Sequence, residues 1–145
     1  MAIRRARIRL DKGELTLSRV TTSQPTLVYV LSTNKSLKYK YGRSRIAYIS
    51  TTKRGLKRIA ESVADKADSM LYRHGITKLT ANFISCRGRR GARLWRKLER
   101  ALIISFRERY GEVPRYNKHG KGWQWDDEGN YFSLIALRSM IEQGE

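Results

Sequence analysis

The start of the chain shows a regular alternation of apolar and polar positions. Arginines alternate with apolar residues over residues 5–10, the polar run 11–14 interrupts the pattern, and Leu15 and Leu17 resume it. A period of two residues is typical of a β-strand, and a short polar interruption between two such runs is typical of a hairpin. The pattern predicts an N-terminal β-hairpin within residues 1–25.

Later runs also have the composition of strands. Residues 26–31 are apolar and rich in β-formers, as expected of a central strand. Further short runs, separated by turn residues such as Asn34-Lys35, predict strands over residues 38–41, 45–50 and 79–86. Together they predict a small antiparallel or mixed sheet.

Helical spacing of apolar residues follows the predicted sheet. Residues 56–67 repeat with the i, i+3, i+4, i+7 pattern of an amphipathic helix, and residues 69–75 predict a short second helix. The longest helical pattern, residues 91–110, is closed by Gly111. A final amphipathic helix is predicted over residues 131–143.

These elements predict an α/β (α+β) fold. A small central sheet is flanked by helices, with a hairpin at the N-terminus and a helix at the C-terminus. The length of 145 residues suits a single domain over residues 1–145.

Charge points to a polyanionic partner. The chain has 31 Lys and Arg against 13 Asp and Glu, a net charge of +18. Such charge repels itself in a compact protein, so we expect nucleic acid as the partner. No apolar stretch is long enough to span a membrane, and the arginine-rich start is unlike a secretory signal. Cys86 has no second cysteine to pair with, which indicates a reducing, cytoplasmic compartment.

The cations are unevenly distributed. No acid occurs between Leu15 and Ala60. Lys and Arg spread over one face neutralise phosphates without reading base sequence. A basic surface with no partner is the alternative. The predicted nucleic-acid contacts are Lys38, Lys40, Arg43, Arg45, Lys53, Arg54, Arg93, Lys118 and Lys121.

Glu99 is the one acid in the arginine-rich run of residues 87–107. On a helix it lies about 40° from Trp95 and Ile103 and about 20° from Phe106, within the apolar stripe. A carboxylate in such a place needs a partner that compensates for its lost hydration. Two interpretations follow, a salt bridge to a neighbouring arginine or a ligand of Mg²⁺.

A second constellation combines tyrosines on strands with an arginine on a helix. Arg58 lies opposite the apolar stripe of its predicted helix. Taken singly, each tyrosine fits aromatic packing across strands, and Arg58 fits an ion pair with Glu61. The tyrosines are Tyr29, Tyr39, Tyr41 and Tyr48.

The order of these residues along the chain resembles the GIY-YIG nuclease superfamily. The triplet ending in Tyr29 stands at the first family triplet, and the triplet that begins with Tyr48 stands at the second. Arg58 matches the family arginine. Glu99 matches the metal-binding glutamate, and Asn117 matches the downstream asparagine.

The resemblance covers residues 26–118, with residues 1–25 as an N-terminal extension and residues 119–145 as a C-terminal one. Neither triplet keeps its glycine. Ser62 stands one helical turn after Arg58, where many relatives have histidine.

The second tyrosine has two candidates. Residues 39–44 are similar to the second strand of a divergent branch of the superfamily, which would select Tyr41. We prefer Tyr48, because it leads directly into the helix of Arg58 at the family's spacing.

The resemblance implies a metal-dependent phosphodiesterase. Glu99 would hold one Mg²⁺ or Mn²⁺ that polarises the phosphate and stabilises the leaving oxygen. Tyr29 and Tyr48 would orient the attacking water, one of them as general base with help from local positive charge. Arg58 would stabilise negative charge on phosphorus, and Asn117 would steady the site.

Three function classes are open. The first is an endonuclease of double-stranded DNA, for which a restriction-type role fits. The second is a non-catalytic RNA- or ribosome-binding protein, and the third is a nuclease-fold module that binds nucleic acid without cutting it. One site cuts one strand, so double-strand cleavage requires a homodimer or sequential nicking, with residues 132–141 as a candidate interface.

Overall fold

The computed structural model describes residues 26–85 and 93–145. Within these two ranges, three strands form one antiparallel sheet in the order β2-β1-β3. The α+β class and the C-terminal helix are therefore confirmed, whereas the hairpin predicted within residues 1–25 lies outside the described residues. The elements are β1 (Leu27–Tyr39), β2 (Gly42–Thr52), α1 (Gly55–Met70), β3 (Leu79–Ser85), α2 (Leu94–Tyr110), the 3-10 helix η1 (Glu128–Asn130) and α3 (Leu134–Glu142).

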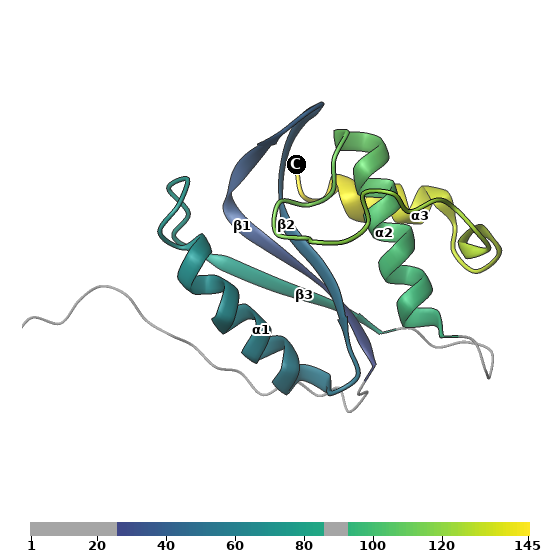
Figure 1. The fold of residues 1–145 in the computed structure, drawn as a ribbon, viewed down its shortest axis with the longest axis horizontal. Coiled ribbons are helices and arrows are strands. Elements are labelled where there is room, and N and C mark those ends of the chain that lie inside the picture. Colours follow the sequence, from purple (N-terminus) through teal and green to yellow (C-terminus); the bar gives the residue numbers. More distant parts are fainter. Residues whose placement is uncertain (1–25, 86–92) are drawn as a thin grey trace, which may run out of the picture.

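The helices cover both faces of the sheet (Figure 1). Successive side chains of a strand point to opposite faces. Leu27 and Tyr29 of β1 therefore pack on Ile59 of α1. Val28 belongs to the larger core that includes Phe106 of α2.

β1 is longer than the sequence predicts. The turn expected at Asn34-Lys35 is wrong, because the strand runs on to Tyr39 with an irregular register to β2. The Asn34 side chain accepts hydrogen bonds from the backbone N–H groups of Thr77 (3.0 Å) and Lys78 (3.1 Å). A residue typical of turns thus joins β1 to the segment entering β3.

The short helix predicted over residues 69–75 is also wrong. α1 continues to Met70, and the chain then turns through His74 and Gly75, whose φ angles are 55° and 68°. Left-handed backbone angles at these two residues exclude a right-handed helix that continues to residue 75. α2 ends as predicted at Gly111, which adopts the left-handed conformation at φ 78°.

The outer edge of β2 is covered by later parts of the chain. The Arg45 N–H donates to the carbonyl of Gly144, and the Tyr116 N–H donates to the carbonyl of Ala47 (3.0 Å). At the next outward position, the Asn117 side chain accepts from the Ile49 N–H (3.0 Å) and donates to the Ile49 carbonyl (2.7 Å). Within the described residues, these outward backbone groups of β2 are bonded by loop and C-terminal residues rather than by a further strand.

Cations of α2 hold the segment that follows this helix. Arg107 donates to the backbone carbonyls of Gly120 (2.6 Å), Lys121 and Trp123. Arg100 forms an ion pair with Glu128 at 2.8 Å. Part of the basic charge of α2 therefore stabilises the fold.

Glu128 is buried, with 1% of its surface exposed. Burial raises the pKa of its carboxyl, but the Arg100 guanidinium and the N–H of Asp126 outweigh that effect, so the pKa is lowered overall. The charged pair is thus a structural feature of the native protein at neutral pH.

No helix in residues 26–85 and 93–145 combines the length and apolar character required to cross a membrane.

Replacing Arg100 with Met should destabilise the protein by about 3 kcal/mol at pH 7, because the substitution leaves the Glu128 charge buried without its partner. Urea unfolding followed by circular dichroism measures the loss. Lys97→Met is the matched control, because Lys97 pairs with the more exposed Asp127 at 2.6 Å. Equal losses in the two variants would contradict the structural role of the buried pair.

Candidate active site

A cavity of about 230 Å³ opens between β2, α1, α2 and the segment after α2. It is called the Glu99 cavity below. Three of the five predicted catalytic residues line it, namely Tyr48, Glu99 and Asn117. Further polar lining residues are Lys66, Lys118 and His119. The fold thus brings residues from four distant parts of the chain to one place.

Glu99 is half-buried on α2, as its position in the apolar stripe predicts. Burial raises the pKa of its carboxyl, and Thr51, Arg96 and His119 act in the opposite direction. Within residues 26–85 and 93–145, no Lys, Arg or His forms an ion pair with Glu99. The salt-bridge interpretation therefore has no support from the described residues.

Tyr29 and Tyr48 lie beside each other on the α1 face of the sheet. Tyr29 pairs with Ser50 across the strands, so Tyr48 is its diagonal neighbour, and the two ring centroids are 6.0 Å apart. The buried Tyr29 hydroxyl donates to Ser62 Oγ at 2.8 Å. Burial is the main reason that the pKa of Tyr29 is raised. Only Tyr48 of the two lines the Glu99 cavity.

The remaining two tyrosines lie elsewhere. Tyr41 is 65% exposed in the turn between β1 and β2, at the far end of the hairpin, and does not line the Glu99 cavity. Tyr39 is buried, donates to the Ile46 carbonyl at 2.7 Å, and has its pKa raised by burial to about 12. Of the two candidates for the second tyrosine, Tyr48 therefore lines the Glu99 cavity and Tyr41 does not.

Arg58 does not line the Glu99 cavity. It is exposed on α1 and pairs with Glu61 at 3.6 Å, one turn along the same helix. The structure brings a different cation of α1 to the cavity. Lys66 places its Nζ 4.1 Å from the ring centroid of Tyr48.

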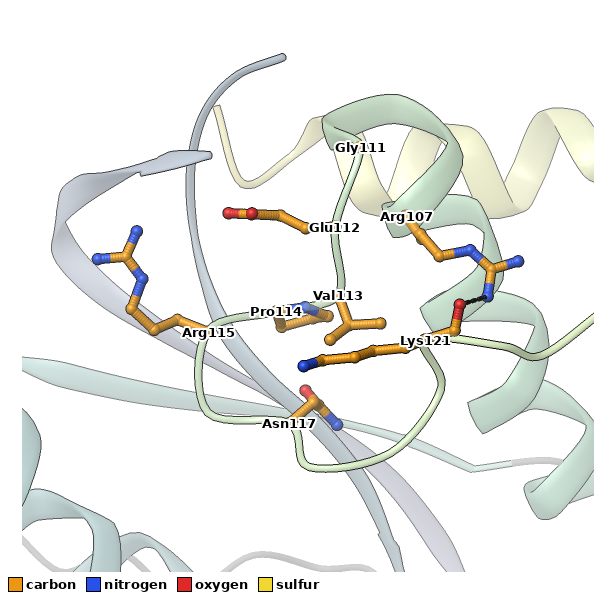
Figure 2. Close-up of a pocket in the computed structure, with 8 residues that line it drawn as sticks. All are labelled: Arg107, Gly111, Glu112, Val113, Pro114, Arg115, Asn117 and Lys121. Carbon is orange, nitrogen blue, oxygen red and sulfur yellow. Dashed lines mark hydrogen bonds between the residues drawn. The ribbon is translucent and has the colours of Figure 1, made fainter. Parts of the chain in front are cut away.

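Asn117 has both ends of its amide group engaged with Ile49. It also lines a second cavity of about 560 Å³, together with Arg107, Arg115 and Lys121. Figure 2 shows the Lys121 side chain pointing across this second cavity, with Asn117 beneath it. Asn117 thus lines both cavities.

All nine predicted nucleic-acid contacts are exposed. Four of them lie on the hairpin near its turn, from Lys38 to Arg45, whereas Lys53 and Arg54 follow the other end of β2. The ends of β2 are about 33 Å apart at the usual rise per residue. Lys118 and Lys121 belong to the segment that covers the middle of this edge.

Sequence reasoning missed Lys66 and left His119 aside. Lys66 has a sequence signal in retrospect, because it continues the one-turn spacing of Arg58 and Ser62 on α1. His119 carries no such signal. Its position follows from the hydrogen bonds that hold the neighbouring Asn117 on β2.

The carboxyl groups near the cavity limit the kind of metal site. Across the described part of the chain, no group of three or more His, Cys, Asp or Glu side chains is arranged to hold a metal. Glu99 is the only acid among the described lining residues. One carboxylate fits Mg²⁺ or Mn²⁺ that keeps several waters and shares its coordination with a phosphate. It does not fit a structural zinc site.

Comparisons of the chain with protein-family models, with curated proteins and with solved structures found no match.

Glu99→Gln should raise the melting temperature at pH 7. The raised pKa means that the folded protein keeps the proton where the unfolded chain has lost it, so stability falls as the pH rises above the ordinary value of 4.5. The glutamine side chain of the variant does not ionise, so the variant's stability does not fall with pH for this reason. The difference between variant and wild type should narrow towards pH 4.

Thermal unfolding between pH 4 and pH 7 measures this difference, with the exposed Glu61→Gln as the control. If the melting temperatures of Glu99→Gln and wild type differ by the same amount at every pH in this range, burial does not destabilise the Glu99 carboxylate.

Proposed function

We propose that the protein is a metal-dependent endonuclease that hydrolyses DNA phosphodiester bonds in the Glu99 cavity. The observation that carries the proposal is that Tyr48, Glu99 and Asn117 line one cavity. The GIY-YIG resemblance points to all three residues in the sequence, and its position in the apolar stripe of a helix also singles out Glu99. The order of strands and helices, β-β-α-β-α, is also the order that the resemblance implies.

Glu99 is the residue that would hold Mg²⁺ or Mn²⁺. The bound ion would supply positive charge to the scissile phosphate and to the leaving oxygen. Glu99 suits this role because its carboxylate is half-buried and lacks an ion pair with the described cations. A cation bound next to a buried carboxylate offsets the free-energy cost of removing that carboxylate from water.

Tyr48 orients the attacking water in this proposal, since its side chain lines the cavity. Tyr29 acts indirectly. Its hydroxyl is committed to Ser62, and its ring supports the ring of Tyr48. Asn117 positions the cavity wall on β2 and takes no part in proton transfer, because its amide is bonded to Ile49.

The exposed cations support double-stranded DNA as the proposed partner. Cations on the hairpin and after β2 lie on either side of the cavity, so a duplex along the β2 edge would meet both groups. Binding of this kind is independent of base sequence and weakens with salt. A restriction-type role fits in the cytoplasm, with a homodimer or two successive nicks for double-strand cleavage.

A second candidate is a nuclease-fold module that binds nucleic acid without cutting it. The position of Arg58 outside the cavity favours this candidate, because the family arginine is then not available at the phosphate. A non-catalytic RNA- or ribosome-binding role would draw on the same exposed cations.

A plasmid-nicking assay tests the proposal. Wild-type protein should nick DNA in the presence of Mg²⁺, and nicking should stop when EDTA removes the metal. Glu99→Gln should slow nicking by about 100-fold or more, because the metal ligand is lost. Tyr48→Phe should slow it by about 100-fold, because the hydroxyl that orients the water is lost.

Tyr41→Phe is the matched control, since it removes the same hydroxyl at the far end of the hairpin. It should nick at the wild-type rate. DNA binding without nicking by wild-type protein would support the non-cutting module. Nicking that survives Glu99→Gln would place the activity at another site.

A further inference from the structure

We infer that Lys66 contacts the substrate phosphate in the Glu99 cavity and supplies the positive charge that the GIY-YIG resemblance assigns to Arg58. This inference rests on the proposed function and deepens it. It concerns which side chain of α1 faces the reacting group.

The position of Lys66 is the first argument. Lys66 is half-buried and lines the Glu99 cavity. Its Nζ lies 4.1 Å from the ring centroid of Tyr48. Within the described ranges no carboxylate forms an ion pair with it. Its charge is therefore free to meet an anion beside Tyr48.

The position of Arg58 is the second argument. Arg58 lies eight residues before Lys66, which corresponds to about 12 Å along the helix axis. Ser62 occupies the turn between them and is bonded to Tyr29. Arg58 itself is paired with Glu61 and has a side chain that is 53% exposed. Nothing in this arrangement directs its guanidinium at the cavity.

The surroundings of Lys66 suit a phosphate. Lys118 and His119 line the same cavity from the segment after α2, so basic side chains come from two separate elements. Lysine binds phosphate as a point charge and needs no bidentate geometry. A half-buried position strengthens its attraction to an anion, because less water screens the two charges.

Inorganic phosphate tests the binding half of the inference. It is titrated into labelled protein while the NMR signals of the Tyr48 ring are followed. Wild type and Arg58→Met should show the same shift, whereas Lys66→Met and Lys66→Gln should weaken phosphate binding by about tenfold. Lys66→Arg should retain it. Circular dichroism checks that each variant is folded.

The nicking assay tests the catalytic half with the same pair of variants. Both Met substitutions remove one positive charge and keep a long apolar side chain. Lys66→Met should slow nicking by about 100-fold or more, and Arg58→Met by much less.

Two outcomes would overturn the inference. One is that phosphate causes no shift of the Tyr48 ring signals in wild type, or that it causes the same shift in Lys66→Met as in wild type. The other is a larger loss of nicking in Arg58→Met than in Lys66→Met. If wild type does not nick DNA at all, the proposed nuclease function fails, and the phosphate titration still decides whether Lys66 binds the anion.

Discussion

The hydrogen bonds that cover the edge of β2 determine where the candidate site lies. Every second residue of this strand directs its backbone N–H and C=O away from β1, and these groups need partners. Tyr116 and Asn117 bond to Ala47 and Ile49, and the C-terminus bonds to Arg45. The segment that carries Lys118 and His119 is thereby held at the edge of β2, where it lines the same cavity as Glu99 and Tyr48.

Among the described residues, two groups of basic side chains have different roles. Arg100 and Arg107 of α2 form contacts within the fold: Arg100 pairs with Glu128, and Arg107 donates to backbone carbonyls of the segment after α2. The cations of the hairpin and the Glu99 cavity are exposed or half-buried. Net charge alone does not distinguish the two groups, because both add to the same +18.

Local patterns predict the elements but not the contacts between them. The helical angle of Glu99 correctly predicts a half-buried carboxylate, since it depends only on neighbours within one helix. The turn at Asn34 is wrong because its partners, Thr77 and Lys78, are more than 40 residues away. The spacing of Lys66 from Arg58 and Ser62 places the three residues on one side of α1, but the contact of Lys66 with Tyr48 depends on how α1 packs beside β2.

We propose above all that Glu99 holds a divalent cation in the cavity that Tyr48 also lines. Paramagnetic Mn²⁺ added to labelled protein tests it directly, because the ion broadens the NMR signals of nearby nuclei. In wild type, the ring signals of Tyr48 and His119 should broaden first, and in Glu99→Gln they should stay sharp at the same Mn²⁺ concentration. Equal broadening in both proteins, or none in wild type, would contradict the claim.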